Sequence, residues 1–421
     1  MSQTNQSSLL PKLRFPEFSE QGSWVVKPLG DLAALVTNRI GDREATLLSV
    51  TSGVGLVSQE EKFGREIAGA ARSNYFSIKV NDFAYNKSAT KEFPQGQIAL
   101  NTDYDNAAVP NSIFTCFRAD ELFVLPDFLK HLFSRNHHGL WLQNFLTVGA
   151  RAHGSLQINN DDLFAMPIPL PDGPRALDEQ KAVASGLNTL DKLIDAELEK
   201  LSVLRQQKQG LLQQLFPDDG QGLPKLRFAK FAEAASWRET TLSQVISLLS
   251  GAHLSPDAYS EIGAVPYFTG PSDFTNDVGL VTKWTDKTTK VAENRDVLIT
   301  VKGSGVGELW YLSLPEVALG RQLMAVRAQS CEDLFLYYFL QTKRSDFVAM
   351  ASGNLIPGLS REDVLSLKIF LPEPDEQRQI SDCLASLDDA LSQQELRTSI
   401  LKKHKLGLLQ QLFPTLEEVT G

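Results

Sequence analysis

Three side chains between positions 172 and 181 have the types that metal-dependent hydrolysis needs. Asp172 and Glu179 could bind a divalent cation through their carboxylates, and Lys181 could lie beside the attacking water. The counterpart of this stretch at residues 374–378 loses the spacing and replaces the lysine with arginine. Glu179 also lies at the start of an expected helix, where an acidic side chain is favoured for structural reasons. A metal-dependent nuclease is therefore the weaker of the alternatives kept open.

The glycine-rich stretch GSGVG at residues 303–307 follows an expected strand, as a phosphate-binding loop would. It lacks the Lys-Ser or Lys-Thr pair of a P-loop and the spacing of a dinucleotide-binding loop. Two interpretations stay open. One is a tight loop that presents its backbone and Lys302 to a DNA phosphate, and the other is an ordinary hairpin turn.

Three histidines fall on one expected helix. His131, His137 and His138 share it with Trp141, but the sequence offers no further ligands that would complete a metal site. A packed or solvated helix face is favoured instead. The sequence also has no Asn-Pro-Pro-Tyr-like or Asp-Pro-Pro-Tyr-like motif, so we expect no amino-methyltransferase centre. We expect no metal site and no catalytic residues.

The composition is typical of a soluble globular protein. The 421 residues, 42% hydrophobic and 22% charged, suffice for two or three domains. No apolar run approaches the roughly 20 residues of a membrane span, and the N-terminus lacks the features of a signal peptide. Cys116, Cys331 and Cys383 are far apart and form no CxxC pair, which favours a reducing cytoplasm. The net charge of −10 has the wrong sign for a simple nucleic-acid binder, although local basic surface decides DNA affinity.

One eight-residue word, GLLQQLFP, occurs at Gly210–Pro217 and again at Gly407–Pro414. It ends a longer repeat, because residues 178–217 align with residues 375–414 without a gap, and both segments begin DEQ. The acidic start suits the positive end of a helix dipole, and the proline suits its end. Each segment therefore predicts one helix of about 35–40 residues, roughly 55–60 Å long.

Apolar residues recur along both predicted helices at intervals of three and four, as in a coiled coil. Two equal helices with such narrow stripes favour antiparallel packing against each other within the chain. Lys208 and Lys405 fall on the stripes, where they could set the register or extend to solvent. The residues expected at this subunit or helix interface are Leu187, Leu190, Ile194, Leu201, Leu204, Leu211, Leu384, Leu387, Leu391, Leu401 and Leu408.

A second word, LPKLRF, occurs at Leu10–Phe15 and at Leu223–Phe228, and a tryptophan follows each copy, Trp24 or Trp237. In the middle of the chain, LFP is followed closely by LPKLRF. At the two ends the same junction is split, because LFP lies near the C-terminus and LPKLRF near the N-terminus. The sequence therefore predicts two copies of one unit, with the chain ends meeting to complete a second copy of the central junction.

The segments between the helices, residues 25–176 and 238–374, are similar in length and different in sequence. Both favour strands and loops, with turns expected at the Asn-Asp and Arg-Asp pairs of YFSIKVNDFAYNKS and NRDVLITVKGSG. Short helices are expected at Asp127–Asn144 and Leu334–Ala349.

The predicted fold class is α+β, with two mixed α/β domains separated by two long helices that form an antiparallel coiled coil. An internal pseudo-twofold repeat relates the two copies. The predicted boundaries are 1–176 for the first domain with its N-terminal segment, 177–217 for the central helix, 218–374 for the second domain and 375–421 for the C-terminal helix.

This order of elements, with DEQ helix starts, LLQQLFP helix ends and LPKLRF before a tryptophan, resembles the specificity subunit (HsdS) of type I restriction–modification systems. The resemblance covers nearly the whole chain. It implies two target recognition domains that each read half of a bipartite site in double-stranded DNA. It also implies conserved helices that set the spacing of these domains and dock two methyltransferase (modification) subunits.

The same resemblance implies a division of labour in antiviral defence. A restriction subunit with nuclease and translocase activity can join the complex, whereas the specificity subunit has no catalysis of its own. No cofactor is expected on this chain, and S-adenosylmethionine, ATP and Mg²⁺ are expected on the partner subunits. Partner subunits could also supply much of the phosphate contact that an acidic chain lacks.

Base edges are read by Arg, Lys, Asn, Gln, Ser and Thr side chains on loops or helix ends. Comparable polar loops follow a strand, or precede the return to the long helix, in both unlike segments. The expected DNA-binding residues are Asn86, Lys87, Ser88, Lys91, Arg151, His153, Ser155 and Gln157 in the first segment, and Lys302, Ser304, Arg321, Gln322, Ser352 and Asn354 in the second. In this comparison, Lys302-Gly303-Ser304 occupies the place of Asn86-Lys87-Ser88.

Besides the nuclease, one non-enzymatic alternative stays open. A pseudo-symmetric coiled-coil adaptor could bind two proteins rather than DNA, since a symmetric frame with two unlike heads suits either use. A third alternative is a specificity subunit that serves a related defence system.

Overall fold

A computed structural model describes residues 9–51, 54–67, 72–145, 156–218, 220–287, 290–353, 358–415 and 417. The chain divides into two compact units, residues 1–198 with 397–421, and residues 199–396. Each unit holds one head and a part of both long helices. The domain boundaries expected from the sequence stay a prediction.

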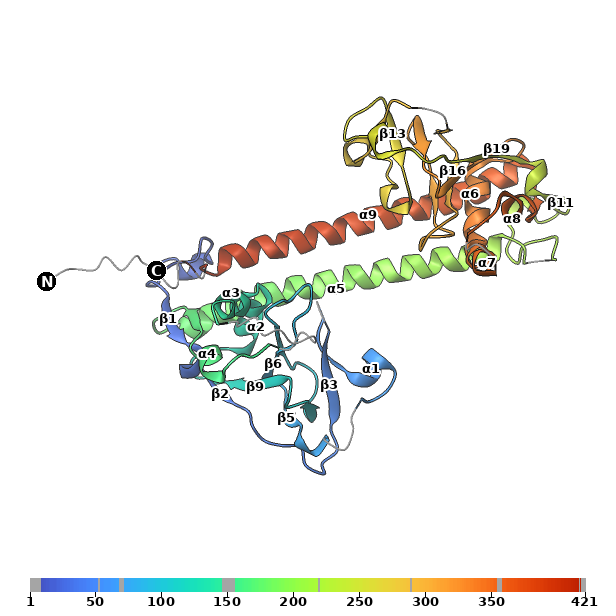
Figure 1. Ribbon diagram of the computed structural model, residues 1–421. Helices are drawn as coiled ribbons and strands as arrows, with labels where there is room; N and C mark the ends of the chain where they lie inside the picture. The colour runs from blue at the N-terminus through green and yellow to red at the C-terminus, as the bar shows by residue number, and fades with distance from the viewer. Residues whose placement is uncertain are drawn as a thin grey trace. The chain divides into compact units, whose positions relative to one another are not determined.

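Two long helices occupy the repeated segments (Figure 1). α5 spans Ala176–Leu215 and α9 spans Pro374–Leu412, each with two acidic residues in its first turn. Both end just before the Phe-Pro pair of the repeated word, since proline disfavours helix in the residue before it. The two long helices predicted from the repeat are confirmed.

Within each unit, the early part of one helix meets the late part of the other. In the first unit, Asp191 of α5 forms an ion pair with Lys405 of α9. In the second unit, Lys208 Nζ of α5 lies 2.6 Å from Asp388 Oδ1 of α9. These are the same two positions of the repeat. A second ion pair in each unit, Glu197 with Arg397 or Arg205 with Glu395, shows that the helices pair antiparallel within the unit. Both lysines on the apolar stripes therefore form an ion pair with the other helix, and a role in setting the register stays a prediction.

The two heads share one topology although their sequences differ. Each has an antiparallel four-stranded sheet (β2-β9-β6-β7 or β12-β19-β16-β17) and a two-stranded sheet (β1-β10 or β11-β20). Each also has a second four-stranded sheet (β4-β3-β8-β5 or β14-β13-β18-β15) with one parallel pair, β3 with β8 or β13 with β18. The expected mixture of helix and sheet is confirmed.

The elements of the first head are β1 Val25–Pro28, β2 Ala33–Leu35, β3 Thr46–Thr51, β4 Gly55–Ser58, α1 Gln59–Phe63, β5 Phe76–Ile78, β6 Asp82–Asn86, β7 Gln97–Leu100, β8 Ala107–Val109, β9 Phe114–Ala119, α2 Pro126–Ser134, α3 His137–Leu142, α4 Asn160–Phe164 and β10 Pro167–Leu170. Those of the second head are β11 Arg238–Thr241, β12 Ile246–Ser250, β13 Val265–Phe268, β14 Trp284–Thr285, β15 Val291–Glu293, β16 Val297–Thr300, β17 Leu309–Tyr311, β18 Glu316–Leu319, β19 Leu323–Ala328, α6 Asp333–Thr342, α7 Arg344–Gly353, α8 Arg361–Leu365 and β20 Lys368–Leu371.

A buried aspartate holds the same turn in both heads. Asp82 accepts two N–H groups of Arg118 at 2.5 and 2.8 Å, and Asp296 accepts two of Arg327, both at 2.8 Å. Each aspartate also accepts the backbone N–H three residues before it, at 2.8 Å. The residue just before each aspartate has a positive φ, 70° or 74°. The turns expected at these two aspartates are therefore present.

Each of the two short helices expected from the sequence is broken into two. The stretch Asp127–Asn144 forms α2 and α3, because Asn136 between them takes a left-handed conformation with φ 62°. The stretch Leu334–Ala349 forms α6 and α7, which are separated at Lys343. An asparagine tolerates this backbone conformation better than most residues, and a periodicity pattern does not reveal it.

The repeated words meet in the same way in both units. The N–H of Leu13 donates to the carbonyl of Gln411 at 2.9 Å, and that of Leu226 donates to the carbonyl of Gln214 at 2.9 Å. An aromatic pair of matching geometry packs beside each contact, Phe128 with Phe413 and Phe216 with Phe335, with ring centroids 5.0 Å apart in both pairs. The two ends of the chain therefore complete a second copy of the central junction, as the sequence predicts.

A buried ion pair joins each LPKLRF word to the DEQ start of a long helix. Arg14 donates to both carboxylate oxygens of Glu179 at 2.8 and 2.7 Å, and Arg227 donates to those of Glu376 at 2.7 and 2.8 Å. Both glutamate side chains are 2% exposed. Trp24 Nε1–H adds a third donor to Glu179 at 3.1 Å. We refer to these two ion pairs as the arginine clamps.

The glutamine of each DEQ start fastens the head to the same helix. The Gln180 side chain accepts the N–H of Leu125, just before α2, at 2.9 Å. The Gln377 side chain accepts the N–H of Glu332, just before α6, at 2.8 Å. The three residues of each DEQ start therefore have different roles. The aspartate is exposed, the glutamate binds the clamp arginine, and the glutamine binds the head.

The three histidines lie in the core of the first head and not on one helix. Nε2 of His131 is 2.9 Å from Asn188 Oδ1, that of His137 is 2.7 Å from the carbonyl of Pro167, and that of His138 is 3.1 Å from the carbonyl of Gly96. Burial lowers the pKa of each ring to about 4. The rings are therefore neutral and packed, which agrees with the expectation of a packed face.

Removing one clamp carboxylate should destabilise the first unit. Glu179→Ala leaves Arg14 buried without its anion, which should lower the free energy of unfolding by about 3 kcal/mol. Asp178→Ala changes the neighbouring exposed carboxylate and should stay within about 0.5 kcal/mol of the unaltered chain. Urea unfolding followed by circular dichroism measures both. Equal midpoints for the two variants would show that the clamp does not hold the unit together.

Acid should unfold the first unit through its histidines. A histidine in an unfolded chain has a pKa near 6.5, and the buried ring of His138 has a pKa of about 4. Unfolding therefore takes up protons between these values, and the free energy of unfolding falls as the pH falls from about 6.5 toward 4.

His138→Gln should reduce this proton uptake by close to one proton in unfolding measured from pH 7.5 to 5. Leu132→Ala is the matched control, because it removes apolar contacts from the same core and no titrating group. It should lower stability by about 2–5 kcal/mol at every pH without changing the slope. An unaltered slope in His138→Gln would mean that this ring is not held neutral.

Candidate nucleic-acid interface

Polar residues expected to contact DNA in the first head follow strand β6. Asn86 ends β6, and Lys87 and Ser88 come next, all three half-buried. Lys91 and Gln157 are exposed. Three of the expected residues of this head, Arg151, His153 and Ser155, lie outside the described residues, as does Asn354 of the second head.

The backbone of Lys87 ties two of these loops together. Its N–H donates to the carbonyl of Ile113 at 2.8 Å, and its carbonyl accepts the N–H of Leu156 at 2.7 Å. Gln157 therefore comes next to the segment that carries Lys87. Burial lowers the pKa of the Lys87 ammonium. The Asn86 side chain is engaged locally, since it accepts the N–H of Ser88 at 3.0 Å.

The second head brings three segments together in the same way. The N–H of Val301 donates to the carbonyl of Gln322 at 2.7 Å, and the carbonyl of Val301 accepts the N–H of Leu359 at 2.8 Å. Lys302 and Arg321 therefore come from neighbouring loops, and both are exposed. Two expected residues complete the set: Ser304 is exposed after Lys302, whereas exposed Ser352 lies on α7 and donates to the carbonyl of Val348 at 2.9 Å.

The correspondence between the heads differs by two residues from the one expected. Counting from the buried aspartates, Lys87 and Val301 are each the fifth residue after the aspartate and make equivalent hydrogen bonds. Lys302 therefore corresponds to Ser88, and Asn86 to Thr300. The correct alignment of the two heads depends on recognising that the two buried aspartates are equivalent. The sequence alone does not show that they are buried.

Sequence reasoning missed the segment Thr269–Asp273 of the second head. A Cβ placed on Gly270 would lie 2.9 Å from Gln322 Oε1, so this backbone touches an expected DNA-binding residue. Asp273 is engaged there, because it accepts the hydroxyl of Thr269 at 2.6 Å and Lys283 Nζ at 2.9 Å. The signal that could have found the segment is its Thr-Gly-Pro turn after a strand.

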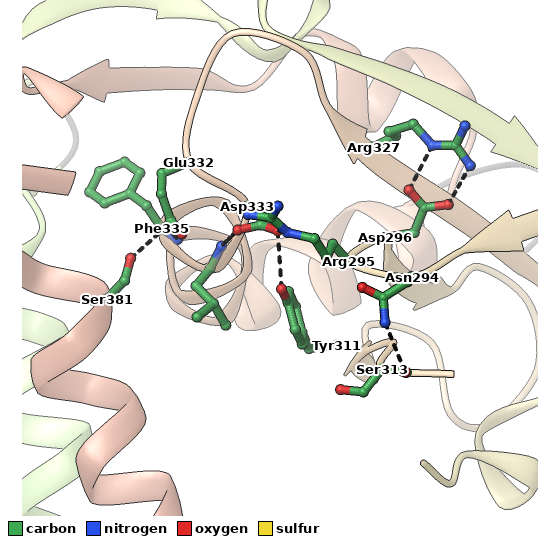
Figure 2. A network of polar contacts seen from close by, with 11 residues as sticks. Asn294, Arg295, Asp296, Tyr311, Ser313, Arg327, Glu332, Asp333, Phe335 and Ser381 are labelled. Atoms are coloured by element: carbon green, nitrogen blue, oxygen red, sulfur yellow. Dashed lines mark hydrogen bonds and ion pairs between the residues drawn. The ribbon is translucent and has the colours of Figure 1, made fainter. Parts of the chain in front are cut away.

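Two arginines of the second head, Arg295 and Arg327, are already engaged with carboxylates. Arg295 and the hydroxyl of Tyr311 both donate hydrogen bonds to the Asp333 carboxylate, and the Tyr311 bond is 3.1 Å long. Arg327 donates to the Asp296 carboxylate (Figure 2). Burial, with help from the Asp333 charge, raises the pKa of Tyr311 to about 12. These groups stabilise the head, and their charges are not free for phosphate.

The nuclease reading has no support in the geometry. The Glu179 carboxylate is occupied by Arg14 and Trp24 and is buried, whereas Asp172 and Lys181 are exposed. A metal ion would have to displace the arginine clamp. Across the described ranges, no group of three or more His, Cys, Asp or Glu side chains could hold a metal ion.

The apolar residues assigned to the helix interface differ in burial. Leu187, Ile194, Leu201 and Leu384 are buried. Half-buried members are Leu190, Leu204, Leu211, Leu387, Leu391, Leu401 and Leu408. Their assignment to an interface, like that of the DNA-binding residues, stays a prediction. No helix in the described part of the chain is long and apolar enough to span a membrane.

Comparison with known proteins agrees with this geometry. Residues 235–401 match the type I restriction modification DNA specificity domain. Two specificity subunits of Methanocaldococcus jannaschii are similar: that of the putative enzyme MjaX is 25% identical over 64% of this chain, and that of MjaVIII is 24% identical over 42%. The matches span 63% and 42% of those relatives, less than two thirds of their length.

A crystal structure of a type I restriction–modification S subunit from M. genitalium has the same fold. Its TM-score is 0.60 at 17% sequence identity, and the alignment covers 96% of this chain and 99% of that chain. The domain match over the second copy and these relatives support a specificity subunit (HsdS) of a type I restriction–modification system.

Proposed function

We propose that this chain gives a type I restriction–modification complex its DNA sequence specificity, each head reading one half of a bipartite site. One observation carries the proposal. The two heads share a topology and equivalent clamps, while the loops at the ends of β6 and β16 carry different side chains. A preserved frame with diverged loops is what two different half-sites require. Specificity subunits recognise DNA and are not catalytic, so the chemistry belongs to other subunits.

Two methyltransferase subunits would dock on the long helices. Val203 and Ile400 stand at the same position of the repeat, and their side chains are 55% and 56% exposed. Apolar side chains exposed at matching positions suit two copies of one partner. S-adenosylmethionine, ATP and Mg²⁺ would be bound by the partner methyltransferase and restriction subunits, with no cofactor on this chain. Basic partner surfaces would offset the net charge of −10 near DNA.

A methylation map tests this proposal. The chain and its methyltransferase partner are expressed together in a host that lacks type I methylation, with the methyltransferase alone as control. Sequencing that detects modified bases should show one bipartite motif with a fixed spacer only when this chain is present. An active complex that modifies DNA with no motif, or with the same motif in the control, would contradict the proposal and favour the protein-binding adaptor.

A further inference from the structure

Gln322 occupies a constrained place just before β19 in the second head. Its carboxamide lies against the backbone of two other segments: an added Cβ on Gly270 would be 2.9 Å from Oε1, and one on Gly303 would be 3.8 Å from Oε1 and 3.9 Å from Nε2. Gly303 has φ 90°, which only glycine adopts freely. Gly270 has an extended backbone, so glycine is needed there for space alone.

The carboxamide of Gln322 is positioned and uncommitted. Among the described residues, no hydrogen bond reaches its side chain, although its backbone carbonyl accepts the N–H of Val301. Other side-chain amides of the same head are engaged, such as Gln329, which donates to Ser247 Oγ at 3.2 Å, and Asn294, which donates to the carbonyl of Ser313 at 2.8 Å. Both the donor and the acceptor of Gln322 are therefore available to a ligand.

The neighbours of Gln322 suit DNA. Arg321 precedes it, and Lys302 and Ser304 flank Gly303, all three exposed. Cationic side chains at this edge can contact phosphates and position the duplex. A side chain with one donor and one acceptor matches the N6 and N7 groups of adenine in the major groove.

We propose that Gln322 reads an adenine in the half-site of the second head, and that the close approach of Gly270 positions its carboxamide. This inference rests on the proposed function. In the first head the equivalent place is held by Ile113, whose carbonyl accepts the N–H of Lys87 in the same way. An isoleucine side chain has no hydrogen-bonding group, so Ile113 cannot recognise a base in the way proposed for Gln322.

Gln322→Glu tests the inference in the same methylation map. A carboxylate cannot donate to adenine N7, but it can accept from N4 of cytosine. At one position of one half-site, the preference for adenine should fall by at least about tenfold, with cytosine gaining. Gln329→Glu, the same change at the other end of β19, should leave the motif unaltered. A motif retained in full by Gln322→Glu and Gln322→Ala would overturn the inference.

Gly270→Ala tests the positioning. An alanine Cβ would meet Oε1 and displace the carboxamide, so the same single position should lose its preference while the other half-site keeps its own. Loss of discrimination spread evenly over both half-sites would mean a structural role and would refute a role in reading. The unaltered chain separates the two proposals: if it specifies no motif, the proposed function fails, and if its motif has no adenine in the second head's half-site, only this inference fails.

Discussion

A bidentate ion pair between an arginine and a glutamate holds each end of the frame. Arg14 with Glu179, and Arg227 with Glu376, join segments that lie about 150 residues apart or more along the chain. A buried ion pair is weak evidence for stability, because desolvation offsets much of the attraction. It is strong evidence for which segments must meet, since either partner left alone in the core is costly. The head, the helix start and the helix end are all arranged around this contact.

Duplication explains why these contacts come in pairs. One copy of the junction is continuous and the other is assembled from both ends of the chain, yet the same leucine N–H and the same phenylalanine pair recur. The long helices show the same duplication, because the ion pairs of Asp191 with Lys405 and of Asp388 with Lys208 use the same two positions of the repeat. The heads keep their buried aspartates but not their loops. Selection for a shared frame and for unlike surfaces would produce this pattern.

The frame could be predicted from the sequence because it is repeated. The repeats GLLQQLFP and LPKLRF indicate that the same junction occurs twice, although neither repeat shows which atoms are in contact. The loops could not be predicted in the same way. The break at Asn136 and the place of Lys302 depend on left-handed backbone and on a buried aspartate, which periodicity does not show. The surroundings of Gln322 depend on Gly270, which is distant in sequence.

The most direct test of the account is to exchange one head and read the methylated motif. Residues 242–367 lie between β11 and β20, which pair with each other and belong to the part of the head next to the clamp. Replacing them with the equivalent segment of another member of the family should change one half of the motif and leave the other half and the spacer length as they were. A change in both halves, or in the spacer, would contradict two independent readers on one frame.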